Sequence, residues 1–309
     1  MSNFGIPYMG SKSKIAASIA LNFPAAENFY DLFGGGFAMS HYMVEKKSHR
    51  YKHFHYNEIK SDVVELVKRA ISGEFNYDVF KPEWISREMF FARKDTDAYV
   101  RCIWSFGNNQ KCYLFGSDIE QYKKSMHQAV VFDEFDSLAE KTLGFNVWPK
   151  SENTTTKKRL YLRRKIEHYR VTKIPEFLHK YLSESQKQKL SQIDNLKKLQ
   201  QLEQLERLQQ LERLEKLSFS ALDYREVAIK ENSIVYCDPP YVGTVGYITG
   251  FNHKEFYDWA ATRNFPVFIS EYTLPDTRFK KVYSVDKRSM LAKDKSVGNK
   301  SENLYWNGK

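Results

Sequence analysis

The chain of 309 residues lacks the features that mark membrane, secreted and metal-binding proteins. No apolar run approaches the roughly 20 residues that span a bilayer, and residues 1–7 lack the basic and apolar regions of a signal peptide. The three cysteines form no CxxC pair, and the eight histidines show no ligand spacing. We therefore expect a cytoplasmic protein with no metal site and no membrane contact.

Two phosphate-binding patterns are also missing from the glycine run that follows the apolar segment 28–33. Gly34, Gly35 and Gly36 stand there, but the dinucleotide pattern G-x-G-x-x-G would require glycine at Met39. The lysine and hydroxyl residues that end a P-loop are absent. Phosphate cradling is thus excluded, although the glycines still allow a ligand to approach the backbone closely.

What is present is a globular composition with an excess of positive charge. Hydrophobic residues make up 42% and aromatic residues 15%, which supports a packed core, and the net charge is +10. Residues 150–190 carry twelve Lys or Arg and four Glu, with tyrosines interleaved. Such a segment is typical of a phosphate-contacting surface, and a solvated helical face is the equally good alternative.

Strand and helix patterns divide the chain into three parts. Residues 28–33 and 53–57 are predicted strands, and residues 37–46 and 62–72 are predicted helices, the second capped by Ser61. Residues 76–217 are predicted to be mostly helical, and strands return at 233–237 and 266–270. This pattern predicts one α/β domain, residues 1–75 with 218–309, that carries the inserted domain 76–217.

A leucine repeat with a period of three occupies the end of the insert. A period of three drifts by about 60° per step around a helix, so no single stripe can bury all of these residues. We predict a helix that meets partners on different sides, with self-association as one candidate role. The repeat comprises Leu190, Ile193, Leu196, Leu199, Leu202, Leu205, Leu208, Leu211, Leu214 and Leu217.

The tetrapeptide Asp238-Pro239-Pro240-Tyr241 closes the apolar run 234–237 and carries the most specific chemistry. The prolines stiffen the turn and leave its carbonyl groups free to accept hydrogen bonds. Asp238 adds a second acceptor and Tyr241 a flat face. Two acceptors beside a stacking surface suit the amino group of a nucleobase. A turn capped by Asp238 is the structural alternative.

An acidic residue after the second predicted strand suits a nucleoside. Glu58 can accept both hydroxyl groups of a ribose, as acidic residues do in nucleotide-binding βαβ units. With the glycine turn, this favours a nucleoside cofactor without essential phosphates. S-adenosylmethionine fits that description.

Four motifs in this order resemble those of the Dam-type DNA adenine-N6 methyltransferases. They are residues 8–12 (YMGSK), 29–38 (FYDLFGGGFA), 57–62 (NEIKSD) and 234–241 (IVYCDPPY). The resemblance implies a Rossmann-like methyltransferase sheet with an inserted, mostly helical target-recognition domain. It also implies an S-adenosylmethionine-dependent enzyme that methylates adenine N6 in double-stranded DNA by base flipping, an activity of restriction–modification systems.

The resemblance also implies roles for individual residues. Asp238, Pro239, Pro240 and Tyr241 would be catalytic, with both N6 protons bound by Asp238 and the Pro239 carbonyl group. The implied cofactor-binding residues are Tyr8, Lys12, Asp31, Gly34, Gly35, Gly36, Glu58, Leu222, Asp223 and Asp238. Asp223 could instead cap the turn that follows it. Residues 247–252 are predicted to close over the target base.

DNA contacts are predicted in the insert. Arg101, Phe106, Asn108 and Asn109 belong to a segment that could meet base edges, with Phe106 as a wedge and core packing around Trp104 as the alternative. The predicted phosphate contacts are Lys157, Lys158, Arg159, Arg163, Arg164 and Lys165.

Two alternative functions remain open at this stage. One is a methyltransferase acting on another planar amine, in RNA adenine, cytosine N4 or protein glutamine. The other is a non-catalytic DNA-binding or assembly protein organised by the leucine repeat. The basic insert favours duplex nucleic acid, and the carboxylate at position 238 favours adenine over cytosine.

Overall fold

The computed structural model describes residues 4–76, 80–182, 197–211, 214–242, 250–287 and 300–309. The chain forms two compact units. Unit 1 comprises Met1–Lys68 and Gln210–Lys309, and unit 2 comprises Arg69–Gln209. The sequence placed the boundaries at 75/76 and 217/218, whereas the units divide at 68/69 and 209/210. That unit 2 serves target recognition stays a prediction.

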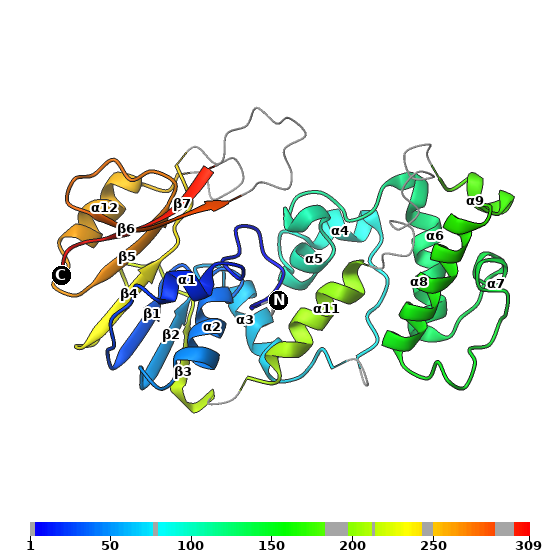
Figure 1. Cartoon of the computed structure of the whole chain (residues 1–309), viewed down its shortest axis with the longest axis horizontal. Helices are drawn as coiled ribbons and strands as arrows, with labels where there is room; N and C mark the ends of the chain where they lie inside the picture. Colours follow the sequence, from blue (N-terminus) through cyan, green and yellow to red (C-terminus); the bar gives the residue numbers. More distant parts are fainter. Residues whose placement is uncertain (1–3, 77–79, 183–196, 212–213, 243–249, 288–299) are drawn as a thin grey trace. The chain divides into compact units, whose positions relative to one another are not determined.

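Unit 1 contains a seven-stranded sheet in the order β3-β2-β1-β4-β5-β7-β6, labelled in Figure 1. Strands β1 to β5 run parallel, and β7 runs antiparallel to both β5 and β6. The sheet is mostly parallel and Rossmann-like, so the predicted α/β fold class is confirmed. The strands are β1 Asn28–Asp31, β2 His53–Asn57, β3 Leu217–Ser220, β4 Ser233–Cys237, β5 Val267–Glu271, β6 Lys280–Lys287 and β7 Lys300–Trp306.

The central strands are covered on both faces, which explains their continuous apolar sequences. Every residue of β1, β4 and β5 is buried. Tyr30, Val235 and Ile269 share one face and pack against Phe256 of helix α12 (His253–Ala261). On the other face, the Phe23 ring contacts the rings of Phe29, Tyr236 and Phe268. The side chains thus alternate between two cores.

Helices α1 (Ala16–Ala20), α2 (Ala38–Lys47) and α3 (Ser61–Ile71) form where the first part of the sequence predicts α/β structure. Strand β1 ends at Asp31 rather than at residue 33, because the glycine turn begins there. Ser61 is the first residue of α3 rather than a residue before it. Of the predicted apolar side of α3, Val63, Val64, Leu66 and Val67 are buried and Ile71 is partly exposed.

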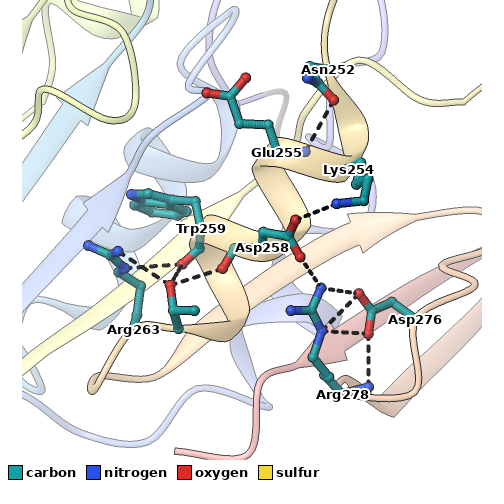
Figure 2. A network of polar contacts seen from close by, with 9 residues as sticks. Asn252, Lys254, Glu255, Asp258, Trp259, Arg263, Asp276 and Arg278 are labelled. Carbon is teal, nitrogen blue, oxygen red and sulfur yellow. Dashed lines mark hydrogen bonds and ion pairs between the residues drawn. The ribbon is translucent and has the colours of Figure 1, made fainter.

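A polar network fixes α12 to the segment before β6 (Figure 2). The Asp258 carboxylate accepts from Lys254 at 3.0 Å and from Arg278 at 2.6 Å, and Arg278 also pairs with Asp276. At the start of the helix, the Asn252 side chain accepts from the backbone N–H of Glu255 at 3.1 Å. These pairs are exposed, so screening by water keeps their contribution to stability small.

Unit 2 is helical, as the sequence predicts for most of the insert. Thr154 caps the long basic helix α8, and its side chain accepts from the backbone N–H of Lys157 at 3.3 Å. The α-helices of unit 2 are α4 Arg87–Arg93, α5 Ala98–Ile103, α6 Ser117–His127, α7 Ser137–Leu143, α8 Thr155–Val171, α9 Glu176–His179 and α11 Lys197–Leu208. Short turns of 3-10 and π helix follow α5 and α6, at Phe106–Asn108 and Gln128–Phe132.

The leucine repeat is not one helix through to Leu217, so that prediction is wrong at its end. Helix α11 covers Lys197–Leu208, a short 3-10 turn covers Leu214–Lys216, and Leu217 begins strand β3. Leu202, Leu205 and Leu208 are completely buried, because the two steps of about 60° between them still fit one broad face. Leu190, Ile193 and Leu196 lie outside the described residues, and self-association through them stays a prediction.

Three strands, β3, β6 and β7, were not expected from the sequence. Strand β3 is hidden because its first residue continues the leucine repeat, and β6 begins with the charged pair Lys280-Lys281. Each of them pairs with a neighbouring strand, for example Leu217 with Phe54 and Tyr283 with Leu304. This pairing stabilises an extended conformation that their own sequences do not predict. No helix in the described ranges is long and apolar enough to cross a membrane.

Candidate active site

The predicted catalytic tetrapeptide lies at the carboxyl end of β4, in the centre of the sheet. Strand β4 pairs with β1 on one side and with β5 on the other. The chain runs outward from β1 to β3 on one side and from β4 to β5 on the other, so the strand order reverses between β1 and β4. Ligands of open α/β sheets bind at such a reversal, outside the carboxyl ends of the strands.

Asp238 lies in a compact cluster of ionisable groups. One of its carboxylate oxygens, Oδ2, is 2.6 Å from Lys12 Nζ. The same ammonium group is 3.4 Å from Glu302 Oε1 on β7 and 4.9 Å from the centre of the Tyr241 ring. The Tyr241 hydroxyl group donates a hydrogen bond to Glu302. The cluster thus brings Lys12 and the tetrapeptide together, and both were predicted site residues. It also contains Glu302, which the sequence did not indicate.

The second carboxylate oxygen of Asp238 has no partner. Asp238 Oδ1 is buried without a hydrogen bond to any residue that the structure describes. Burial raises the pKa of Asp238, the Lys12 ammonium opposes that rise, and the Glu302 charge adds to it. A buried acceptor without a donor is costly, which favours a ligand N–H group at this position.

His253 of α12 holds the backbone of the tetrapeptide, and Glu271 of β5 holds that of Val242, which follows it. His253 Nε2 donates to the Pro240 carbonyl oxygen at 2.7 Å, which places the ring proton on Nε2 because a carbonyl group only accepts. Glu271 accepts from the backbone N–H of Val242 at 3.3 Å and of Tyr272 at 2.8 Å. Burial raises the pKa of Glu271 to about 7. The sequence predicts that residues 270–272, which end a strand, border this pocket, and Glu271 belongs to them; His253 belongs to none of the motifs recognised in the sequence.

The glycine turn is pressed against the N-terminal segment. A Cβ atom on Gly36 would lie 2.4 Å from Tyr8 Cβ, and one on Gly34 would lie 2.2 Å from the Tyr56 ring. Gly35 has a φ of +47°, a left-handed conformation that disfavours other residues. The glycines are therefore required for packing as well as for ligand approach, and Tyr8 lies beside the turn as predicted.

Asp31 ends β1 beside this turn and is buried. Its Oδ2 atom accepts from the Ser40 hydroxyl group at 2.7 Å, and Oδ1 has no hydrogen-bond partner among the described residues. Burial raises the pKa of Asp31 to about 7. Such a carboxylate suits a positively charged ligand group, because a cation would restore its ionised form.

Glu58 follows β2 and faces the same turn. Its carboxylate accepts from the backbone N–H of Gly35 at 3.0 Å and of Lys60 at 3.1 Å. A carboxylate has about four lone-pair sites, so acceptor capacity remains for ligand hydroxyl groups. Glu58 thus stabilises the turn, and its predicted contact with a ribose stays a prediction.

Asn57 places Leu222 at this edge. Its side chain donates to the Leu32 and Leu222 carbonyl groups and accepts from the Leu222 backbone N–H, each at 3.0 Å. Leu222 is 41% exposed and Ile59, after β2, is 51% exposed. Two exposed apolar residues after neighbouring strands suit a flat ring. The sequence indicated Leu222 but not Ile59 or the role of Asn57.

Asp223 takes the alternative role that its sequence position suggested. Its carboxylate accepts from the backbone N–H of Arg225 at 3.0 Å and pairs with the Arg225 guanidinium group at 2.8 Å. Asp223 therefore caps its turn, and its predicted contact with a cofactor has no support from this geometry.

Comparison with protein families decides the class of this site. The family model of the D12 class N6 adenine-specific DNA methyltransferases matches residues 8–268, which include the glycine turn, Glu58 and the tetrapeptide. The chain belongs to this family. Comparison with curated proteins gives no match. The predicted recognition, enzyme class and adenine-N6 activity on DNA are thereby confirmed, and a methyl donor is implied.

In unit 2 of this methyltransferase, a tight loop presents one aromatic side chain. The loop closes between Ser105 and Tyr113, and Phe106 is 56% exposed while Trp104 is completely buried. Asn108 and Gln110 have left-handed φ values of 60° and 62°. Trp104 packs in the core, as the alternative reading expects, whereas Phe106 projects from it, and its role as a wedge stays a prediction.

The remaining predicted loop residues have structural partners. Asn109 Oδ1 accepts from the backbone N–H groups of Lys111 and Cys112, both at 2.9 Å. Asn108 Oδ1 accepts from Gln201 Nε2 of α11 at 2.6 Å. Arg101 is only 7% exposed and donates to the Lys94 carbonyl oxygen at 2.8 Å, so its burial argues against a contact with DNA.

The basic residues of α8 fall into two groups. Lys158 pairs with Asp133, and Arg159 pairs with Glu203 of α11, so both are part of the fold. Arg163 and Arg164 are 59% and 71% exposed, Lys157 is exposed, and Lys165 is partly exposed. Arg163 pairs with Glu167 at 3.9 Å and Arg164 with Glu152 at 3.8 Å, and both face solvent, whereas Lys158 and Arg159 face the protein.

Proposed function

We propose that the methyl donor is S-adenosylmethionine and that it binds across the carboxyl ends of β1, β2 and β3. The observation that carries this proposal is the buried Asp31 Oδ1 atom, which lacks a partner among the described residues and suits the donor's ammonium group. Gly34, Gly35, Gly36 and Tyr8 would line the methionine part. Glu58 would accept from the ribose, and Ile59 and Leu222 would flank the adenine ring.

We propose further that the target adenine leaves double-stranded DNA to reach the tetrapeptide. Asp238 Oδ1 and the Pro239 carbonyl oxygen would accept the two N6 protons and Tyr241 would face the ring. The N6 lone pair is delocalised into the ring, so two acceptors would localise it and fix its direction. When bound, the donor supplies an electrophilic methyl group on positively charged sulfur.

The exposed residues of α8 and the Phe106 loop would meet the DNA. Lys157, Arg163, Arg164 and Lys165 would contact phosphates, which position the protein without reading sequence. Phe106 would enter the base stack, supported by its exposure and by the rigid loop around it. A cytoplasmic location remains a prediction from the cysteine pattern.

Two measurements test this function. Purified protein is incubated with unmethylated duplex DNA and methyl-labelled donor, and the modified nucleosides are identified by mass spectrometry. We expect N6-methyladenine, and its loss in Asp238→Ala but not in Asp258→Ala, a surface carboxylate of α12. Formation of N4-methylcytosine instead, or preferred labelling of matched RNA, would support an alternative substrate. Calorimetric titration should show donor binding that Asp31→Asn weakens at least about tenfold.

A further inference from the structure

Glu302 is a second carboxylate beside the lysine that pairs with Asp238. Lys12 Nζ lies 2.6 Å from Asp238 Oδ2 and 3.4 Å from Glu302 Oε1. Glu302 is 2% exposed and Lys12 is 5% exposed. Two carboxylates and one ammonium group leave an excess negative charge in a buried place.

Such an arrangement is expensive if it serves only the fold. A buried carboxylate costs several kcal/mol unless it is paired, and here both carboxylates draw on one cation. Buried ionisable groups that perturb one another cluster at functional sites. The groups around Asp238 come from several elements: Lys12 before α1, Asp31 on β1, Tyr236 on β4, Tyr241 in the tetrapeptide, Glu271 and Tyr272 at the end of β5, and Glu302 on β7.

The reaction creates a proton that must leave the adenine amine. After N6 gains a methyl group it carries a positive charge, and one N6–H bond has to break. Asp238 Oδ1 is a buried oxygen without a partner among the described residues, and an O–H bond can form there. A carboxylate held by a full ion pair with lysine would be a poor acceptor, because the ammonium group stabilises its charged form.

We propose that Glu302 is a positioning residue that acts through Lys12. By competing for the ammonium group, Glu302 leaves the Asp238 carboxylate able to take up the proton that N6 releases. While Asp238 is protonated, Glu302 remains as the counterion of Lys12, so the buried lysine never loses its partner. This inference rests on the proposed role of Asp238 at the adenine amine.

The electrostatics and the hydroxyl contact agree with this role. The Glu302 charge raises the pKa of Asp238, and the Lys12 ammonium lowers it. The hydroxyl group of Tyr241 donates to Glu302 and fixes its carboxylate beside Lys12. Glu302 thus contacts Tyr241 directly and influences the charge of Asp238 through Lys12.

The test measures the pKa of Asp238 directly, in the protein without donor or DNA. Aspartate labelled with ¹³C at the carboxyl carbon gives one signal for each residue, and Asp238→Asn identifies the signal of interest. We expect Glu302→Gln to lower the pKa of Asp238 by about one unit, a tenfold change in acidity. Tyr241→Phe keeps the Glu302 charge and removes a hydroxyl group that lowers the pKa of Asp238, so it should shift this pKa upward instead.

Methyl transfer in a single turnover is the second readout. Glu302→Gln should slow transfer about tenfold at neutral pH and move the acidic limb of the pH–rate profile to lower pH. The donor concentration for half saturation should change less than about threefold. An unchanged Asp238 pKa in Glu302→Gln, or wild-type transfer rates across the pH range, would overturn the inference.

Two further variants keep the outcome decisive. If Glu302→Gln does not fold, Glu302→Asp draws the charge away from Lys12, and the Asp238 pKa should again fall; an unchanged value again refutes the role. Asp238→Asn separates the two proposals. If Asp238→Asn still methylates DNA, the proposed role of Asp238 fails. If Asp238→Asn is inactive but Glu302→Gln leaves the pKa of Asp238 unchanged, only the inference about Glu302 fails.

Discussion

His253 Nε2 and the Pro240 carbonyl oxygen are joined by a hydrogen bond of 2.7 Å that ties the first turn of α12 to the tetrapeptide 238–241, which we propose to be catalytic. The two prolines lack N–H groups, so the backbone of this turn has few other ways to be held. We expect His253→Ala to slow methyl transfer about fivefold to tenfold, the equivalent of one hydrogen bond. Donor affinity should not change. Lys254→Ala, an exposed neighbour, is the control, and equal rates in both variants would contradict this role.

Gly36 should tolerate no side chain. A Cβ atom would lie 2.4 Å from Tyr8 Cβ and 3.0 Å from the Ile6 carbonyl oxygen, so Gly36→Ala must displace the N-terminal segment. We expect a loss of about 1–3 kcal/mol of stability together with weaker donor binding. Gly116→Ala serves as the control in thermal unfolding, because Gly116 has an ordinary φ of −68° and its Cβ would meet only the flexible side chain of Asp118. If Gly36→Ala is as stable as that control, the N-terminal segment around Tyr8 can move to accommodate the added methyl group.

Asp31 should make the stability of the donor-free enzyme fall as the pH rises from about 4 to 7. Burial raises its pKa from 3.8 to about 7, so in this range the folded protein holds a proton that the unfolded chain has released. The free energy of unfolding therefore decreases with pH across that window, by about 1.4 kcal/mol per unit of pKa at most.

Chemical unfolding at several pH values checks this slope. Asp31→Asn should flatten the curve between pH 4 and 7. The pKa of Asp276 is lowered by its hydrogen bond with Arg278, so Asp276→Asn should lower stability above pH 3.8 and change the slope of stability against pH only around and below that ordinary value. A slope that survives in Asp31→Asn would assign it to another group, such as Glu271.

The exposed part of α8 should carry the salt dependence of DNA binding. Replacing Arg163 and Arg164 by alanine should weaken binding to all duplex sequences alike and reduce the slope of log affinity against log salt by about 0.9 per lost phosphate contact. Lys158→Ala removes a residue that pairs with Asp133, so it should lower stability and leave the slope unchanged. Fluorescence anisotropy at several salt concentrations distinguishes the two, and equal slopes would refute the assignment.

Gln201 should influence which DNA sequence is methylated, although it is buried in α11. Its amide group donates to Asn108 Oδ1 at 2.6 Å and so holds the loop that presents Phe106. Gln201→Leu should reduce discrimination between the preferred site and single-mismatch sites by about 1 kcal/mol. Gln204→Leu on the same helix is the control. If Gln201→Leu keeps the same site preference, the role of α11 is confined to packing within unit 2 and does not extend to the choice of DNA sequence.

The sequence predicted the parts of the site that depend on local backbone chemistry. Asp238, the glycine turn and Glu58 follow strand ends, where residue types and spacing reveal the geometry. Glu302 and His253 were missed because they reach the site through sheet order and helix packing. Glu302 lies 64 positions from Asp238 but 290 from Lys12, and β7 gives no local sign of pairing beside β5. The burial of Arg101 was also missed, because charge in a sequence does not reveal burial.

The position of β3 has a consequence for synthesis. Strand β2 emerges early, but its partner β3 follows only after the whole of unit 2, and Phe54 pairs with Leu217. Until then one edge of β2 has exposed, unpaired backbone groups, which invite association with other chains. Folding of unit 2 during this interval would shorten the effective gap between the two strands and reduce the entropy lost in joining them. The insert would therefore protect the nascent chain as well as extend the finished enzyme.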